Sequence, residues 1–293
     1  MAGLFGLFNY DKVGPGIPKN GPKKKTFVVF FETFFRNIWK FITMNVIYTL
    51  MCIPAVTSGM ANVGLTNVCR NTARDKHSFG LSDFFETIKK NLKQSIIAGI
   101  INTVVTVLLV IAVWYYWATL TATGMQGTIS VIGLGIVLAL SITFIMMNYY
   151  LWTLIITFSY TLKQAYSISF KLVFLNFKYS FLCLFINALI LASNIGILFI
   201  TGTAWIYALL IEILLLILIY PGFNGLLIQF CTFPSIRKFI IDPYYKEHPG
   251  EDIEKRKRLG LEIEEEKSVV KETDENESET EDDEDEDDTI FND

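Results

Sequence analysis

Histidine is nearly absent from this chain, which has two histidines among 293 residues. His77 and His248 are not spaced as metal ligands are. The chain also lacks the HExxH, GxSxG and phosphate-loop patterns, and no GxGxxG precedes a helix. These absences argue against hydrolytic, nucleotide-dependent and metal-dependent chemistry. We therefore expect a non-enzymatic protein with no catalytic residues, no metal site and no cofactor.

Cysteine is scarce as well, and its four copies are scattered along the chain. They lie within or at the ends of apolar runs and form no CxxC pair: Cys52, Cys69, Cys183 and Cys231. We predict free, buried thiols rather than a disulfide framework. The first twenty residues also lack the basic start and the cleavage site of a secretory signal. The hydrophobic spans themselves are therefore expected to direct membrane insertion.

Charge is absent over long stretches, and this absence indicates the class of protein. Gln94–Leu162 contains no Asp, Glu, Lys or Arg, and Tyr179–Ile236 contains only Glu212. A helix needs about 20 apolar residues to cross a bilayer, so each run has room for two crossings. With 52% hydrophobic residues and a mean hydropathy of +0.42, the chain exceeds what one soluble core can bury. The sequence predicts an all-α membrane protein.

A third charge-free run, Phe41–Cys69, is too long for one span and too short for two. Pro54, Ser58 and Gly59 near its middle predict a turn or kink. We therefore expect three helical hairpins that enter from the cytoplasm, the first of them short or tilted, with five to six membrane helices. The alternative is a single first span with an outside N-terminus, which puts the basic segment 23–25 on the wrong side.

Basic residues flank the spans and predict their orientation. Residues 1–250 carry a net charge of +11, whereas residues 251–293 carry −15. Because Lys and Arg favour the cytoplasmic side of a membrane, we place both the N-terminus and the acidic tail in the cytoplasm. The predicted division is a Gly/Pro/Lys-rich N-terminus at 1–26, a membrane domain at 27–249 and a disordered acidic tail at 250–293.

The segments between spans on the opposite side are short and uncharged, at 121–128 and 201–203. Trp114–Trp117 precedes the first of these turns, as an outer aromatic belt does. Basic anchors at the inner membrane surface are expected at Lys89, Lys90, Lys93, Lys171 and Lys178. Because the basic residues flank spans, they favour the lipid bilayer rather than nucleic acid as partner.

A sequence pattern recurs at the entries to the second and third hairpins. Phe85-x5-Asn91-x-Lys93-x-Ser95-x5-Ile101-Asn102 returns further along the chain as Phe170-x5-Asn176-x-Lys178-x-Ser180-x5-Ile186-Asn187. The pattern predicts parallel hairpin repeats near 85–162 and 170–240. The alternative is that interfacial helices share composition because they share physics. Each copy begins with an amphipathic interfacial helix; in the first, Phe85, Ile88 and Leu92 form the apolar face.

Polar side chains within the spans form a candidate intramembrane polar site: Glu212, Asn102, Asn187 and Asn148. Glu212 lies about 10 Å below Trp205 along a helix, too deep for a short carboxylate to reach water easily. No Lys or Arg lies in a span, so the amides and hydroxyls are its expected partners. Either hydrogen bonding that fixes helix packing or a proton-linked or substrate-contacting site fits this pattern. A small-residue stripe at Gly135, Ala139 and Thr143 predicts close helix packing.

Several segments resemble the YesL family of bacterial membrane proteins: Gly3–Lys12, Gly14–Lys19, Gly64–Thr66 with Arg70 and Arg74, Ser82–Phe85 and Lys89–Asn91. The resemblance covers residues 1–245. It implies a multi-pass protein of the cell membrane, mostly of Gram-positive bacteria, with an undefined biochemical function. Family members are often encoded beside carbohydrate ABC importers, which implies importer subunits as partners.

Two functions follow as expectations. The first is a non-enzymatic accessory or assembly subunit associated with carbohydrate uptake, which the resemblance implies. The second is a small-solute carrier or channel, which the repeats and Glu212 favour. Pro221-Gly222 is expected to break its span, although the other copy has no counterpart. The chain lacks the Glu-Ala-Ala-x3-Gly loop of importer permeases, so we do not expect it to be the permease itself.

Overall fold

The computed structural model describes residues 25–76, 79–123, 127–200 and 205–247. Within these residues the chain is helical and contains no strand, which confirms the all-α class. Almost all of the predicted N-terminal segment 1–26 lies outside the described residues, and so does the whole acidic tail 250–293. The chain divides into two compact units, with the boundary after Ile236.

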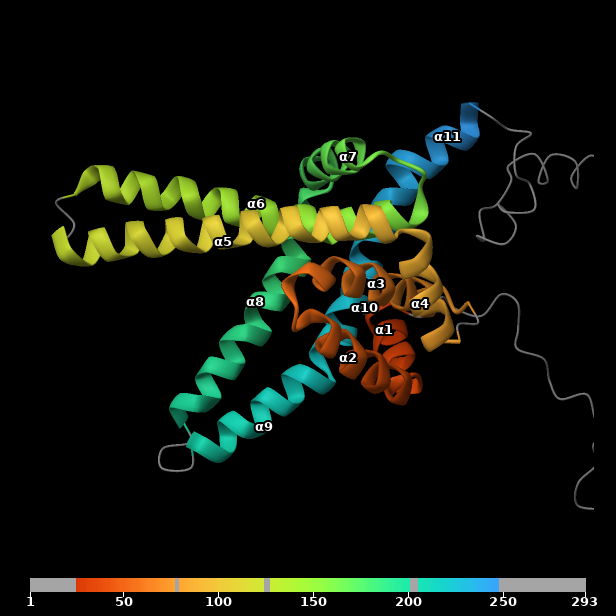
Figure 1. The fold of residues 1–293 in the computed structure, drawn as a ribbon, viewed down its shortest axis with the longest axis horizontal. Helices are drawn as coiled ribbons and strands as arrows, with labels where there is room; N and C mark the ends of the chain where they lie inside the picture. Colours follow the sequence, from red (N-terminus) through yellow and green to blue (C-terminus); the bar gives the residue numbers. More distant parts are fainter. Residues whose placement is uncertain (1–24, 77–78, 124–126, 201–204, 248–293) are drawn as a thin grey trace, which may run out of the picture. The chain divides into compact units, whose positions relative to one another are not determined.

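Ten helices and one 3-10 turn are described in the first unit (Figure 1). In chain order they are α1 (Thr26–Arg36), α2 (Ile38–Cys52), η1 (Ala55–Thr57), α3 (Ser58–Ala73), α4 (Leu81–Lys90), α5 (Leu92–Thr123), α6 (Thr128–Thr157), α7 (Leu162–Leu175), α8 (Phe177–Ile200), α9 (Trp205–Leu218) and α10 (Tyr220–Ile236). The second unit contains the π-helical turn η4 (Arg237–Ile241) and α11 (Asp242–Glu247). An ion pair between Arg237 and Asp242, 3.5 Å long, links these two elements.

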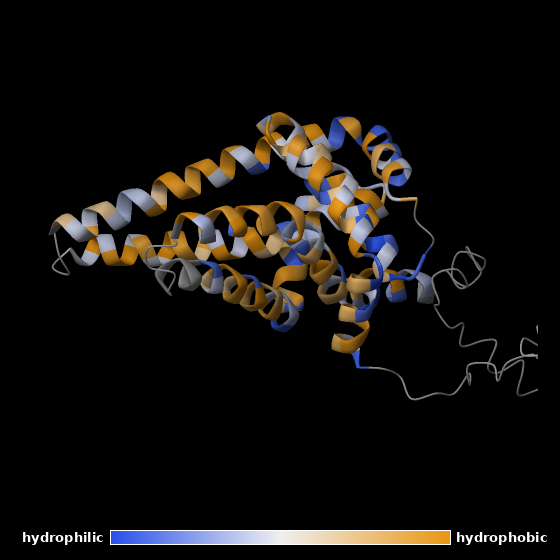
Figure 2. Ribbon diagram, turned by 90° about the horizontal axis from the view of Figure 1, so that it is seen from below, coloured by the Kyte–Doolittle hydropathy of each residue, from blue (hydrophilic) through white to orange (hydrophobic). Residues whose placement is uncertain are grey.

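Three helices are long and apolar enough to cross a membrane, over Leu92–Ala122, Thr128–Thr157 and Phe177–Asn194. Helices α9 and α10 pass the same test as a pair that is bent by 48°, and counting this pair as one broken span gives up to four spans. Figure 2 shows hydrophobic residues along most of the length of the long helices. These spans, counted among the described residues, indicate a multi-pass membrane protein.

The expected five to six membrane helices are too many by this criterion, and the difference lies in the first hairpin. Helices α2 and α3 have 15 and 16 residues. At about 1.5 Å per residue each is shorter than the hydrocarbon core of about 30 Å. The turn predicted around Pro54, Ser58 and Gly59 is confirmed, because α2 ends at Cys52 and α3 begins at Ser58. The run that lacks charge is therefore a short, broken pair of helices.

An asparagine stands at each of three helix junctions. Asn37 separates α1 from α2, Asn91 separates α4 from α5, and Asn176 separates α7 from α8. All three leave the helical conformation, with ψ between 18° and 40°. The side chains of Asn37 and Asn91 donate to the carbonyl oxygen four residues earlier, at 2.9 and 3.0 Å. The same local geometry thus recurs at the predicted repeat positions, and the repeat itself stays a prediction.

The apolar face of α4 differs from the predicted one. Phe84 and Ile88 are buried, whereas Phe85 is 45% exposed. Phe84 packs against Gly64 of α3 so closely that a Cβ on that glycine would lie 2.6 Å from the ring. The buried face of α4 is shifted by one residue because α4 packs on α3. The sequence prediction placed this helix alone on the membrane surface and therefore did not include that contact.

Helix α3 is the centre of the first unit, since it contacts α2, α4, α5, α6 and α10. Its approach to α5 depends on two glycines: a Cβ on Gly59 would lie 2.7 Å from the Cα of Gly99. Beside them, Val63, Ala98 and Leu151 belong to one buried apolar cluster. The predicted stripe at Gly135 is not such a contact, because a Cβ there would meet nothing within 4 Å in the described structure. Sequence spacing alone cannot tell a small residue that packs from one that faces outward.

Candidate functional site

A cavity of about 880 Å³ opens between α3, α5, α6 and α10. Four asparagines are among its lining residues: Asn62, Asn102, Asn148 and Asn224. The aromatic lining residues are Phe144, Tyr149, Trp152, Trp114 and Trp117. None of the described residues that line this cavity is charged. Its volume lies within the range of about 300–1,000 Å³ that is typical of small-molecule sites.

Asn102 and Asn148 are the pair of predicted site residues that the structure brings together. Asn102 Nδ2 donates to Asn148 Oδ1 across 2.7 Å, which joins α5 to α6. Tyr166 of α7 donates its hydroxyl to Asn102 Oδ1 at 3.1 Å. Asn148 Nδ2 donates to the carbonyl oxygen of Phe144 at 2.9 Å. Three helices thus fix the orientation of two amides at the cavity wall.

A smaller pocket of about 150 Å³ shares Asn62, Asn148 and Asn224 with this cavity and continues it between α2, α3, α6 and α10. Gln229 lines the smaller pocket and is only 2% exposed. Its Nε2 donates to the Thr153 hydroxyl at 2.9 Å, while its Oε1 has no hydrogen-bond partner among the described residues. Asn224 Oδ1 also lacks one there. A buried polar atom without a partner is costly, so these two amides are available to a ligand.

The smaller pocket lies beside the break between α9 and α10, with Pro221 among its lining residues. Pro221 has no N–H to continue the helix, which accounts for the bend. Asn45 of α2 donates to the carbonyl oxygens of Leu218 and Ile219, at 2.7 and 3.3 Å. Asn45 is fully buried and adds a side-chain donor at the break, where the Ile219 carbonyl also accepts from the backbone N–H of Phe223 at 3.1 Å. The break that the Pro221-Gly222 pair predicts is therefore present and is held in place by α2.

The other two predicted site residues lie elsewhere. Asn187 of α8 accepts a hydrogen bond from Tyr220 at 3.0 Å and donates to the carbonyl oxygen of Cys183 at 2.9 Å. Glu212 of α9 is 7% exposed, and its Oε1 has no hydrogen-bond partner in the described part of the chain. Neither residue lines the cavity or the smaller pocket. The four predicted residues therefore form one pair and two separate sites.

The predicted basic anchors are all exposed: Lys89, Lys90, Lys93, Lys171 and Lys178. Lys90 forms an ion pair with Glu86 on the same helix at 2.7 Å. The cysteines are free, as predicted; Cys52 is half-buried and the others are buried.

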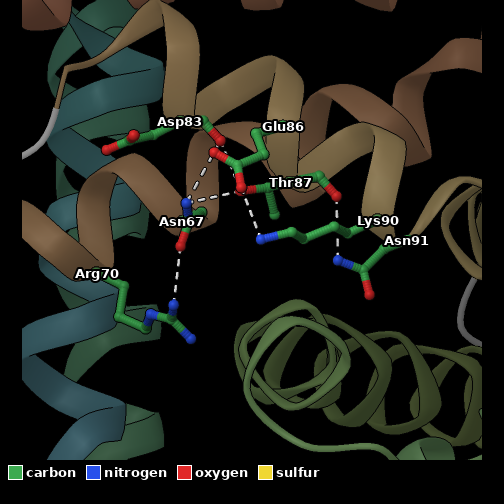
Figure 3. A network of polar contacts seen from close by, with 7 residues as sticks. All are labelled: Asn67, Arg70, Asp83, Glu86, Thr87, Lys90 and Asn91. Carbon is green, nitrogen blue, oxygen red and sulfur yellow. Dashed lines mark hydrogen bonds and ion pairs between the residues drawn. The ribbon is translucent and has the colours of Figure 1, made fainter.

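A polar network connects α3 to α4 (Figure 3). Asn67 Nδ2 donates to the Thr87 hydroxyl at 2.7 Å, and Asn67 Oδ1 accepts from Arg70 at 2.8 Å. Arg70 also donates to the Thr157 hydroxyl at 2.8 Å, at the last residue of α6. A guanidinium at a helix C-terminus is favoured by the helix dipole. Arg70 thus ties α3, α4 and α6 together.

Residues 41–113 match a family described as "Protein of unknown function, DUF624". These residues therefore resemble the DUF624 family. The YesL family carries DUF624, so the predicted resemblance to it is confirmed over residues 41–113. The comparison with curated proteins gave no match, and neither did the comparison with solved structures. The family description assigns no activity, and the site must be interpreted from its own chemistry.

The DUF624 region supplies one side of the cavity, including Asn62 and Asn102, while Asn148, Trp152 and Asn224 come from later in the chain. Sequence reasoning missed Asn62, Asn224 and Gln229. Asn62 lies on a helix that is too short and polar to be a span, and Asn224 and Gln229 follow a helix break. The usable signal was that all three are amides within charge-free runs.

Proposed function

We propose that this chain is a non-enzymatic membrane protein that binds an uncharged, hydroxyl-bearing solute, and that it serves carbohydrate uptake as an accessory or assembly subunit. The observation that carries the proposal is the amide-lined cavity, with four asparagines and no charged side chain among its described lining residues. Carboxamides both donate and accept hydrogen bonds, as solute hydroxyls do. Without a charge in the wall, the desolvation cost of an ionic solute is not compensated.

The aromatic side chains make the proposal more specific. Trp152 and Tyr149 lie beside the amides, whereas Trp114 and Trp117 line the same cavity beyond Asn102, toward the C-terminal end of α5. Aromatic faces pack against apolar C–H surface, and polar groups at one end fix the orientation of a ligand. A glycoside with an apolar aglycone combines these two features. Support for a role in carbohydrate uptake comes from the YesL resemblance and is associational.

Ligand-dependent thermal unfolding tests the binding step. The purified protein is studied in a detergent without a sugar headgroup, because alkyl glycoside detergents would occupy the site. We expect neutral glycosides such as phenyl glucoside to raise the unfolding midpoint, and a glycoside with a carboxylate to have little effect. The matched variants are Asn148→Leu at the cavity and Thr143→Val, which lies on the same helix but outside the lining residues. The proposal fails if neutral glycosides have no effect, or if Asn148→Leu responds as the wild type does.

A solute carrier is the second candidate, and the bent pair α9–α10 beside the smaller pocket favours it. Broken helices near the middle of a membrane form the solute sites of many transporters. Reconstitution into proteoliposomes separates the two functions. An accessory subunit binds glycoside without counterflow and co-purifies with importer subunits in mild detergent, whereas a carrier supports counterflow alone. Absence of both binding and counterflow would exclude both functions.

We also propose that the chain lies in the cell membrane of a Gram-positive bacterium. In this orientation both termini are in the cytoplasm and the hairpins enter the membrane from that side. The exposed lysines at the starts of α5 and α8 support this orientation. Cysteine labelling in intact cells tests it. A cysteine at Lys171 should be protected from an impermeant reagent, and a cysteine at Thr123 should react. Labelling at Lys171 would reverse the orientation.

A further inference from the structure

Arg70 lies in the last turn of α3 and Arg74 directly follows that helix, and the solute cavity does not account for them. Neither forms an ion pair within the part of the chain that the structure describes. Burial lowers the pKa of both guanidinium groups to about 10, and the charge of Arg70 contributes to the lowering at Arg74. Both stay protonated at neutral pH. Two like charges are therefore held close together and partly shielded from water, without a described carboxylate to neutralise them.

The two arginines differ in what they contact. Arg70 donates to neutral oxygens of Thr157, Ile156 and Asn67, which accounts for its position. Arg74 makes no such bonds to described residues: its guanidinium lies 4.1 Å above the ring centre of Phe233, and its Nε is buried without a partner. Stacking on an aromatic ring fixes the plane of a guanidinium while its N–H groups stay available. The Arg74 guanidinium is thus held in one orientation, while it has no hydrogen-bond partner among the described residues.

A pocket of about 170 Å³ lies at this point, lined by Arg70 and Arg74 at the end of α3 together with Gln229 and Phe233 of α10. Thr26, the first residue of α1, also lines it. Helix α1 begins without a side-chain cap and without an acidic residue in its first turn. The first N–H groups of a helix carry partial positive charge. The pocket therefore combines two guanidinium groups with an uncapped helix start.

We propose that this pocket binds the phosphate group of an anionic ligand, with Arg74 as its principal contact and Arg70 as a supporting charge. A planar guanidinium pairs with two phosphate oxygens at once, and a helix N-terminus adds N–H donors to a third. The Gln229 amide can present either its oxygen or its nitrogen, because the Thr153 hydroxyl can accept or donate. In the flipped orientation the amide offers its two N–H groups to the anion.

The phosphate has two sources in a membrane protein: the headgroup of an anionic lipid, or a soluble phosphate ester. Both place the same chemistry in the pocket. The test uses delipidated full-length protein in a neutral detergent, at an ionic strength held constant with chloride. One arm adds inorganic phosphate and the other adds phosphatidic acid. We expect at least one to raise the unfolding midpoint by about 2–4 °C. A rise with phosphate indicates a soluble source, and a rise with phosphatidic acid alone indicates a lipid.

Three variants decide whether the pocket is the site. Arg74→Gln should lose the rise, and Arg74→Lys should keep part of it, because lysine has the charge without the two-pronged geometry. Lys163→Gln, an exposed lysine on α7 outside the predicted membrane anchors, is the charge-matched control and should respond as the wild type does. The proposal is overturned if neither anion stabilises the wild type, or if Arg74→Gln keeps the full rise.

Chemical footprinting keeps the test decisive if Arg74→Gln does not fold. Phenylglyoxal modifies accessible guanidinium groups, and mass spectrometry reports the modified peptide. In the wild-type protein, the stabilising anion should slow modification of Arg74 several-fold while modification of Arg36, which pairs with Asp75, is unchanged. Equal rates at Arg74 with and without the anion would also overturn the proposal.

Discussion

Asn102 on α5 and Asn148 on α6 are joined by a hydrogen bond of 2.7 Å at the wall of the cavity of about 880 Å³. The bond has two roles in our account. It connects the two longest described helices, and it orients both amides toward a solute. Each role predicts a separate measurement.

The structural role is tested by a double-mutant cycle of Asn102→Leu and Asn148→Leu. Interhelical hydrogen bonds in membranes contribute about 0.6 kcal/mol on average and up to about 1.7 kcal/mol. We expect a coupling energy in that range, measured from reversible unfolding in mixed micelles. Thr143→Val serves as the control, since the Thr143 hydroxyl bonds to the carbonyl of Ala139 on its own helix. Additive effects of the two asparagine variants would show that the bond contributes nothing.

The close approach of α3 and α5 predicts a strong contrast between two glycines. Gly99→Leu forces a side chain against the backbone of Gly59, whereas Gly135→Leu adds one where nothing described lies within 4 Å. Overpacking costs about 1–3 kcal/mol, and backbone contact leaves little room to relax. We expect Gly99→Leu to lower the unfolding midpoint clearly and Gly135→Leu to leave it unchanged. If Gly135→Leu is the more damaging variant, its stripe packs against something and the sequence prediction was right.

Asn45 and the α9–α10 break predict a rescue. Asn45→Ala leaves the carbonyl oxygens of Leu218 and Ile219 without their side-chain donor, which we expect to cost about 1–3 kcal/mol. Pro221→Ala restores a backbone N–H and lets the helix straighten. In that background Asn45→Ala should therefore cost less. Thermal unfolding of the wild type, the two single variants and the double variant measures the two costs. Equal costs in both backgrounds would show that Asn45 does not stabilise the break.

Glu212 now carries a different prediction from the one that its sequence context gives. A carboxyl group that donates a hydrogen bond would make Glu212→Leu destabilising. Because Oε1 is buried without a hydrogen-bond partner among the described residues, we expect Glu212→Leu to leave the unfolding midpoint unchanged or to raise it. Glu212→Gln keeps the shape of the side chain and removes the ionisable group, so it is the control that tests a functional role of the carboxyl group. A marked loss of stability in the leucine variant would show that the carboxyl group has a partner.

The sequence predicted the helical class, the turn at Pro54 and the break at Pro221, because charge-free length and proline act locally. It grouped Asn102 and Asn148 with Asn187 and Glu212 as polar residues in apolar runs, and the structure joins only the first two. Depth in a span is readable from sequence, whereas the helix that each residue faces is not. By length and composition, three to four spans are described where five to six membrane helices were predicted, because a run without charge can be buried inside a protein as well as in lipid, as α2 and α3 show.

Fluorescence of Trp152 tests the central claim most directly, because this side chain lines the amide cavity. The other four tryptophans are replaced by phenylalanine, which keeps the apolar wall, and the protein is placed in nanodiscs. Our account predicts a saturable change in Trp152 emission as a neutral glycoside is added, and no change in the same protein carrying Asn148→Leu. Absence of a saturable change, or an identical change in the Asn148→Leu protein, would contradict it.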